Sequence, residues 1–303
     1  MNNFSYKGVN KDNNYFEGWY INLVDDKQQL SYVVIFGISL YEKDPHSFIQ
    51  IINGQNNKSD YLRFSVNDFV YNYNSISIKD NYLSLHVLKL NTKKLTIDVT
   101  ITDHEFLDTN CLIPGTMGFL KYFPLCAKHE ILYLQANAKG TINDNNTKYD
   151  FDGISYMEKN WGSHFPKQWI WTQTNHFNTQ NIQFVLIYTK LSIFDIPAFF
   201  CVLKIKGAEY RFATYNWSKI DILTMNDDHM IVNICNDDLK LNIKIDNNHN
   251  DIPIIAPVKD GHMLKVIGET INTTLTLSLY KGNNCLFNGR ASHVHYENLY
   301  INQ

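Results

Sequence analysis

Apolar residues at every second position constrain the fold of this chain more than any other feature of its sequence. Residues 95–101 read Leu-Thr-Ile-Asp-Val-Thr-Ile, and residues 239–245 and 275–279 alternate in the same way. Successive side chains of a β-strand point to opposite faces, so this period predicts strands with one buried face and one wet face. Such strands build antiparallel sheets and barrels, and a helical bundle is disfavoured.

Shorter apolar and aromatic runs extend the pattern through most of the chain. Aromatic residues make up 14% of the sequence, which favours strands further. Asn, Asp and Gly separate the runs, and these residues suit turns because they tolerate positive φ angles. Many short strands at short spacing are typical of a sandwich or a barrel. The further strands that we expect are residues 15–23, 30–40, 48–52, 61–66, 76–78, 82–88, 131–138, 169–177, 184–191, 198–205, 211–215 and 263–269.

The length of the chain favours two domains. It has 303 residues, and a single hydrophobic core usually stops growing at about 250–300 residues. The strand rhythm breaks between Pro114 and Pro124, and a fresh run of strands begins after Asp152-Gly153. We therefore predict one domain over residues 1–152 and a second over residues 153–303.

Charge and cysteine content argue against several classes of protein. The formal net charge is −3, and no segment gathers the basic residues that binding to phosphates needs, so nucleic acid is not an expected partner. The five cysteines lie far apart without a Cys-x-x-Cys, which signals neither a disulfide framework nor a zinc site. We recognise no leader and no run of about 18 apolar residues that would cross a membrane. A cytoplasmic protein is the resulting prediction.

Motifs for cofactors are also missing from the sequence. There is no glycine-rich nucleotide loop and no nucleophilic-serine elbow, so we expect no cofactor. The closest histidine pair lies in His293-x-His295-x-Glu297, which could form a surface metal site. Residues of a solvated strand explain this pattern better, and we predict no metal site.

Two segments depart from simple alternation because they mix aromatic and polar residues. In residues 14–20, strand geometry places Tyr15, Glu17 and Trp19 on one face. Glu17, between two aromatic residues, lies either at the solvated edge of a sheet or in a pocket where a partner holds it, and an edge strand is an equal alternative.

The second segment, residues 153–177, has one face with Tyr156, Glu158 and Asn160 and, after a turn, one face with Trp169, Trp171, Gln173 and Asn175. Each polar group on such a face would need a partner in a dry core. The mixture suits a ligand pocket, and a hydrogen-bonded plug that closes the end of a barrel is an equal alternative.

The second segment contains the run Tyr156-Met157-Glu158-Lys159-Asn160-Trp161-Gly162, followed by Phe165-Pro166 and the aromatic stretch 169–177. This run resembles the signature of the tocopherol cyclase-like family. Residues 15–20 are similar to the N-terminal motif of that family, and residues 45–50 and 114–129 match weaker blocks. Beyond residue 177 only the strand-rich character and a loose match at 289–297 agree.

The resemblance implies two lipocalin-like antiparallel β-barrels packed together, with a hydrophobic ligand in or between them. The wider superfamily includes carotenoid 1,2-hydratases and lipocalin-like pericyclases, which act on carbon–carbon double bonds without a redox cofactor. In the cyclase reaction, an alkene of a prenylated hydroquinone is protonated while the phenol oxygen attacks the tertiary carbocation. The reaction requires an acid, an acceptor near the phenol, and aromatic walls that shield the cation.

Glu158 is the proton donor that we expect, and Glu17 is the alternative acid. A carboxyl group among aromatic side chains in a dry pocket has its charged form disfavoured, so its pKa should rise. Carotenoid hydratases resemble this chain in placing an acidic residue two positions after a tyrosine, as in Tyr156 and Glu158. Tyr156, His129 and His46 are candidates to orient the phenol and take its proton.

Further residues of the motifs are expected to bind the substrate. The π faces of the tryptophans could stabilise a cation, although packing in a core is an equal alternative. Lys159 points away from Glu158 on an ideal strand, and it could pair with Glu17 of the other barrel as a structural element. The expected binding residues are Glu17, Trp19, Tyr20, His46, Gln50, Asn160, Trp161, Trp169, Trp171, Gln173 and Asn175.

The sequence leaves more than one function open. We predict an enzyme that cyclises or hydrates a prenylated aromatic or another polyene by acid catalysis. A non-catalytic carrier of a hydrophobic small molecule would use the same pocket. A sandwich that binds glycans is a third interpretation, which an exposed row of Trp169 and Trp171 would favour. Peripheral contact with a membrane and the oligomeric state stay open.

Overall fold

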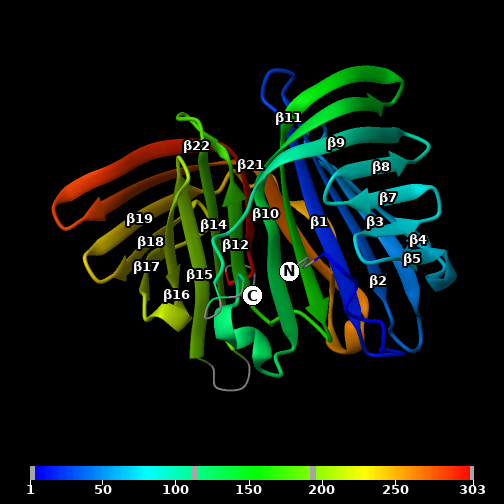
Figure 1. Cartoon of the computed structure of the whole chain (residues 1–303), viewed down its shortest axis with the longest axis horizontal. Helices are drawn as coiled ribbons and strands as arrows, with labels where there is room; N and C mark the ends of the chain where they lie inside the picture. Colours follow the sequence, from blue (N-terminus) through cyan, green and yellow to red (C-terminus); the bar gives the residue numbers. More distant parts are fainter. Residues whose placement is uncertain (1–3, 111–112, 114, 192–195, 301–303) are drawn as a thin grey trace. The chain divides into compact units, whose positions relative to one another are not determined.

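The computed structural model describes residues 4–110, 113, 115–191 and 196–300 (Figure 1). Regular structure among these residues consists of β-strands and short 3-10 helices. The all-β class predicted from the alternation is therefore confirmed. Within the same residues, no helix has the length and hydropathy needed to cross a bilayer. The chain divides into two compact units, each with its own sheet and its own core.

Unit 1 comprises Met1–Thr109, Pro124–Phe165 and Ile254–Val266. Its strands form one antiparallel sheet in the order β4-β3-β2-β1-β11-β10-β9-β8-β7-β6-β5, which curves around a cluster of apolar side chains (Figure 1). Two short helices, η1 (Val66–Asp68) and η4 (Lys259–Gly261), belong to this unit. The strands are β1 (Phe16–Asp25), β2 (Leu30–Ser39), β3 (His46–Asn53), β4 (Lys58–Phe64), β5 (Phe69–Tyr71), β6 (Ser75–Ile78), β7 (Asn81–Ser84), β8 (Val87–Asn91), β9 (Leu95–Glu105), β10 (Ala127–Asp144) and β11 (Thr147–Gly162).

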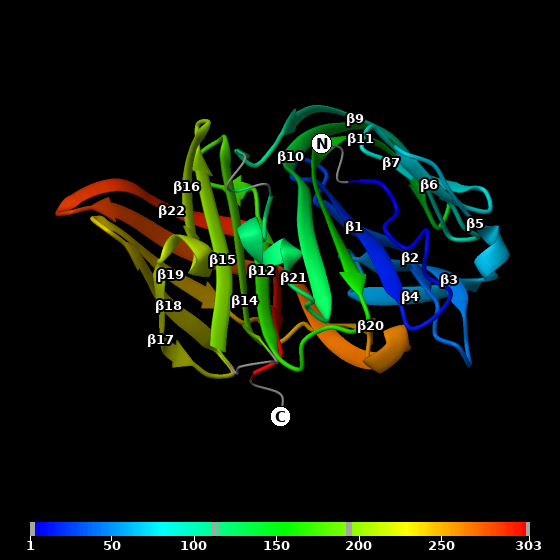
Figure 2. The same ribbon diagram turned by 60° about the horizontal axis from the view of Figure 1, so that its bottom comes forward.

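Unit 2 comprises Asn110–Phe123, Pro166–Pro253 and Ile267–Gln303. Its antiparallel sheet follows the order β16-β15-β14-β12-β22-β21-β19-β18-β17, and β13 and β20 pair with β22 and β21 (Figure 2). The helices η2 (Gly118–Tyr122) and η3 (Thr214–Asn216) belong to unit 2. The strands of this sheet are β12 (Trp169–Thr174), β13 (His176–Phe177), β14 (Ile182–Leu191), β15 (Ile196–Ile205), β16 (Ala208–Ala213), β17 (Lys219–Met225), β18 (His229–Asn236), β19 (Leu239–Asp246), β20 (Ile252–Pro257), β21 (Met263–Lys281) and β22 (Asn284–Asn298). Residues 254–257 of β20 and 263–266 of β21 fall within unit 1.

Both sheets follow the same path through their unit. The first long strand of each unit pairs with the last, β1 with β11 and β12 with β22. In both units the last two strands form a long hairpin, β10–β11 and β21–β22. The two units therefore share a strand topology, although the sequence shows no repeat at a fixed period.

The predicted domain boundary near residue 152 falls inside β11, whereas the division into units passes between Phe165 and Pro166. The sequence predicted that a fresh run of strands begins after Asp152-Gly153. In the structure Gly153 pairs with Ala138 of β10, and a Cβ atom at Gly153 would lie 2.1 Å from the carbonyl oxygen of Val24. The glycine thus permits close approach of neighbouring strands, and β11 continues through it.

Burial of the strands divides them into two kinds. In β9 and β19, buried residues alternate with residues that are exposed or half-buried, as the period predicted. In β1, β3 and β12, both faces are buried over nearly the whole strand. Residues 16–20 and 169–174 lie on strands of this second kind, and residues 155–159 of β11 are also buried on both faces, so the polar side chains there must find partners.

Candidate functional site

The core face of β1 and β11 holds a buried ion pair. Trp19 lies opposite Lys159 in the register of the two strands, and Glu17 lies opposite Trp161. The Nζ atom of Lys159 is 3.0 Å from Oε1 of Glu17, and both side chains are fully buried. The predicted pairing of Lys159 with Glu17 is therefore found, although both residues belong to unit 1 rather than to two barrels.

The two tryptophans of this face surround the ammonium group. Nζ of Lys159 lies 5.3 Å from the ring centroid of Trp19 and 4.9 Å from that of Trp161, within the range of cation–π attraction. Burial raises the pKa of Glu17 and lowers the pKa of Lys159 to about 8, while the attraction between the two groups opposes both shifts. The cation that Trp19 and Trp161 stabilise is thus a lysine of this protein.

The N-terminal segment closes over the same ion pair. Lys159 donates to the backbone oxygen of Ser5 at 2.8 Å, and the indole N–H of Trp19 donates to the oxygen of Phe4 at 2.9 Å. Oε2 of Glu17 accepts hydrogen bonds from the backbone N–H of Lys7 at 2.8 Å and from the hydroxyl of Tyr15. Of the two positions that the sequence left open for Glu17, the structure has the buried one, where partners hold the carboxyl group; β1 lies between β2 and β11 and is not an edge strand.

The opposite face of β11 carries a different cluster, formed by Tyr156, Glu158, Asn160 and, from β10, His129. Glu158 is 5% exposed and Tyr156 is fully buried. The hydroxyl of Tyr156 donates to Oε2 of Glu158 at 2.6 Å, and the amide of Asn160 donates to Oε1 at 3.1 Å. Nε2 of His129 lies 3.6 Å from Oε2 of Glu158. The three residues predicted for catalysis, Glu158, Tyr156 and His129, therefore lie together. Asn160, which was predicted to bind the substrate, lies with them.

Asn160 connects the imidazole to the carboxyl group and selects the tautomer of the imidazole. Because its NH₂ group faces Glu158, its oxygen faces Nδ1 of His129, at 2.9 Å, and Nδ1 must be the protonated nitrogen. In the neutral ring Nε2 is then the acceptor, and it is the nitrogen nearer to Glu158. Nε2 therefore faces the carboxyl group across 3.6 Å, outside direct hydrogen-bonding distance.

Two irregularities in β10 create this juxtaposition. Near the hairpin Asp144 pairs with Thr147 and Ala136 with Ser155, and an unbroken register would place Ile131 opposite Asn160. Register shifts between Ile131 and Tyr133 and between Tyr133 and Ala136 bring His129 there instead. Such bulges re-aim side chains, and here they direct the imidazole toward the carboxyl group.

Neighbouring strands continue this face of the sheet. Tyr20 of β1 lies opposite Glu158 in the register, and Ile131 of β10 lies opposite it on the other side. Tyr20 is buried, as predicted for a binding residue near the carboxyl group, but its contact with a ligand stays a prediction.

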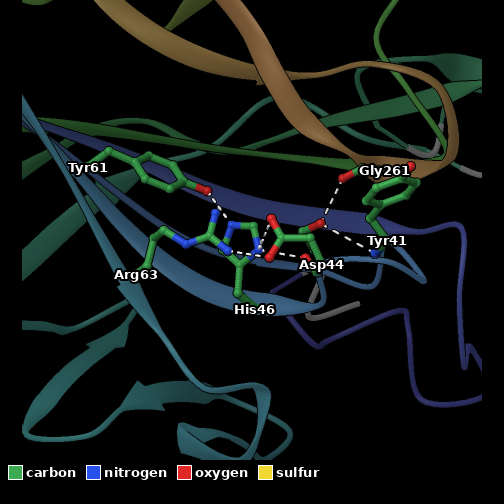
Figure 3. A network of polar contacts seen from close by, with 7 residues as sticks. Tyr41, Asp44, His46, Tyr61, Arg63 and Gly261 are labelled. Atoms are coloured by element: carbon green, nitrogen blue, oxygen red, sulfur yellow. Dashed lines mark hydrogen bonds and ion pairs between the residues drawn. The ribbon is translucent and has the colours of Figure 1, made fainter.

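His46 and Gln50 lie on β3 and are held by the protein itself. Nδ1 of His46 bonds to the oxygen of Asp44 at 2.8 Å and Nε2 bonds to the hydroxyl of Tyr61 at 2.7 Å, in the network drawn in Figure 3. Burial lowers the pKa of His46, which suits a neutral ring with both nitrogens engaged. The amide of Gln50 donates to and accepts from the backbone of Ile255, at 2.8 Å each. Both side chains anchor local structure.

The remaining predicted residues belong to unit 2. Trp169 and Trp171 of β12 are buried, at 7% and 5% exposure, which removes the exposed aromatic row that glycan binding would need. The indole of Trp169 donates to Glu297. Gln173 is buried and lies opposite His295 in the register, whereas Asn175 is half-buried.

Unit 2 also contains a buried acid–base pair, which was not predicted from the sequence. Nδ1 of His295 lies 3.1 Å from Oε1 of Glu269, and both side chains are almost completely buried. The ring of Trp171 meets the imidazole edge-on, with 6.3 Å between centroids. The prediction that His295 is a solvated strand residue was wrong, because β22 is buried on both faces at this point. Among the described residues, no group of three His, Cys, Asp or Glu is arranged to hold a metal ion.

Two curved antiparallel sheets with buried acid–base clusters define a protein of the double lipocalin-like class. The structure matches a protein designated AttH from Nitrosomonas europaea with a TM-score of 0.59 at 11% identity, covering 97% of this chain and 94% of that one. It also matches kievitone hydratase from Nectria haematococca with a TM-score of 0.53 at 10% identity, covering 98% and 94%. At these identities the likeness shows the fold.

The chain belongs to the tocopherol cyclase-like family, whose model matches residues 92–297. A chloroplastic tocopherol cyclase of Zea mays is 38% identical over 65 residues. That stretch is 21% of this chain and 14% of the maize protein. The match therefore spans only a small part of the curated relative.

Proposed function

We propose that this protein is an enzyme that protonates a carbon–carbon double bond of a hydrophobic, prenylated substrate and thereby cyclises or hydrates it. The single observation that carries the proposal is the cluster in which buried Glu158 contacts Tyr156 and Asn160 and faces His129. Family membership supports a reaction of this class, since the maize relative is named a cyclase and a protein with the same fold is named a hydratase.

Glu158 is the acid in the proposed mechanism. Its carboxyl proton passes to the less substituted alkene carbon, which leaves a tertiary carbocation and a carboxylate. The hydroxyl of Tyr156 and the amide of Asn160 then stabilise that carboxylate, because both donate hydrogen bonds to it. Burial of the cluster strengthens these contacts during the step.

His129 is the group that completes the proton cycle. In cyclisation the phenol oxygen of the substrate attacks the cation and loses its proton to Nε2 of His129, which returns it to Glu158. In hydration a water molecule takes the place of the phenol. The protein ends each cycle with its original proton count, and the tautomer set by Asn160 keeps Nε2 ready to accept.

The test is incorporation of solvent deuterium into the product. A prenylated hydroquinone incubated with the protein in heavy water should gain one deuterium on the new ring, and Glu158→Gln should lower the rate by roughly 10²–10⁴, the range for removal of a general acid. Glu130→Gln is the matched control, because Glu130 is equally buried on the neighbouring strand but lies opposite Lys159 in the register. Its deuterium uptake should stay near the wild-type rate.

Two outcomes would contradict the proposal. Wild-type deuterium uptake by a correctly folded Glu158→Gln variant would remove Glu158 as the acid. If the wild-type protein retains a hydrophobic ligand in native mass spectrometry but incorporates no deuterium into the product, the result would instead support a non-catalytic carrier of a hydrophobic small molecule.

A further inference from the structure

Unit 2 carries a cluster of exposed aromatic side chains on η2 and η3 and the residues that follow them. We name it the η2–η3 patch, and it consists of Phe119, Tyr122, Phe123 and Trp217. Trp217 is 90% exposed, Tyr122 73%, Phe123 52% and Phe119 48%. Large aromatic side chains gathered in water mark an interaction surface.

The two parts of the patch are in contact. The ring of Phe119 lies 6.3 Å from that of Tyr215 in η3 and 6.4 Å from that of Phe123. Gly118 has a positive φ and lies against the ring of Tyr215, so η2 fits closely on η3. η2 and η3, about 100 positions apart in the sequence, thus contact each other, and Trp217 directly follows η3.

The backbone holds Trp217 outward. Trp217 has a φ of 64° in the left-handed region, which disfavours side chains other than glycine and a few polar ones. Asn216 fixes this turn, because its side-chain oxygen accepts from the N–H of Ala213 at 2.9 Å and from the hydroxyl of Ser218 at 2.7 Å. A strained residue that presents its indole to water points to a functional role for this side chain.

Two lysines flank the patch. Residues 109–129 and 210–220 contain no Asp or Glu, and Asp108, Glu130, Glu209 and Asp221 stand directly at their ends. Lys121 lies 5.2 Å from the ring of Tyr122, and Lys219 is exposed two residues after Trp217. Trp and Tyr prefer the region between lipid headgroups and acyl chains, and flanking lysines add attraction to anionic headgroups.

We propose that the η2–η3 patch docks this protein onto the surface of an anionic lipid bilayer. The aromatic side chains enter the headgroup region and Lys121 and Lys219 contact lipid phosphates. The proposal rests on the patch alone, and it does not depend on the function proposed for Glu158. Docking at such a surface would give an enzyme access to a substrate dissolved in the membrane.

The test is co-sedimentation of the full chain with vesicles. Binding is expected to vesicles of phosphatidylcholine with phosphatidylglycerol and to be much weaker with phosphatidylcholine alone. Trp217→Ser should lower the partition coefficient about tenfold, the effect of one large aromatic side chain. Lys219→Glu should lower it at least fivefold on anionic vesicles, because one lysine near such a surface contributes about that factor.

Tyr122→Ser tests the aromatic contact with the bilayer, and Tyr73→Ser is its matched control. Tyr73 is 66% exposed but lies in unit 1, so its replacement should leave vesicle binding unchanged while replacement of Tyr122 weakens it. Glu158→Gln should bind vesicles like the wild type, which separates this proposal from the proposed function. Equal binding of the two tyrosine variants, equal binding to both lipid mixtures, or self-association through the patch without vesicle binding would overturn docking.

Discussion

Replacement of Lys159 by Met removes the cation at the centre of the ion pair on the core face. The variant keeps the length and the apolar stem of the side chain but loses the 3.0 Å contact with Glu17 and the 2.8 Å bond to Ser5. It also leaves the carboxylate of Glu17 in a fully buried position without its counter-charge. Breaking a buried pair in this way costs about 3–5 kcal/mol.

This cost should be visible as a lower melting temperature. For a domain of 150–250 residues, each kcal/mol shifts the midpoint by roughly 2–4 °C, so Lys159→Met should melt about 6–20 °C below the wild type. The measurement is thermal unfolding followed by circular dichroism at neutral pH. Lys139→Met is the matched control, because Lys139 pairs with Asp152 at 3.2 Å but both side chains are more than half exposed. It should stay within about 0.5 kcal/mol of the wild type.

Melting temperature and deuterium incorporation, measured on the same variants, separate a structural role of the Glu17–Lys159 pair from a catalytic role. The double variant Glu17→Gln, Lys159→Met removes both charges and should recover part of the lost stability, since no unpaired charge remains buried. Equal melting temperatures for Lys159→Met and Lys139→Met would refute the reasoning. An unchanged melting temperature of Lys159→Met together with lost deuterium incorporation would instead assign the Glu17–Lys159 pair a role in the reaction.

Two further predictions concern the packing of β11 and the pH dependence of stability. Gly153→Ala should destabilise the protein by about 1–3 kcal/mol in urea unfolding, because its Cβ would meet the oxygen of Val24, whereas Gly18→Ala in β1, with its nearest neighbour 3.7 Å away, should be tolerated. Equal unfolding midpoints for the two variants would contradict the close approach of the strands at Gly153. Burial lowers the pKa of His46 below 6.5, so the unfolded chain takes up the proton first. The contribution of His46 to the free energy of unfolding is therefore present above pH 6.5 and declines as the pH falls below it, a slope that His46→Asn should lack. The same slope in both proteins would contradict this assignment.

Strand alternation predicted much of the candidate site. It placed Tyr156, Glu158 and Asn160 on one face and Lys159 on the other, and the structure has this arrangement. It also led to the pairing of Lys159 with Glu17. Side-chain period is a property of the strand itself, so it can be read without knowledge of the neighbouring strands.

Alternation did not reveal which faces are buried. His295 was read as solvated because a single strand gives the same pattern whether its polar face meets water or another buried group. In the structure His295 and Glu269 face each other from adjacent strands. Trp19 and Trp161 were expected to stabilise a substrate cation or to pack in a core, and in the structure both rings lie near Nζ of Lys159 on the face that the N-terminal segment covers.

The sequence by itself determined the all-β class, the positions of most strands and the grouping of side chains along each strand, because all of these follow from local period and turn chemistry. Only the tertiary structure decided that β11 continues through Gly153 and that His129 stands opposite Asn160. The second point depends on two register shifts in β10, which together displace the pairing by two residues and bring His129, rather than Ile131, opposite Asn160. Register is set by contacts between distant parts of the chain, which a local pattern does not record.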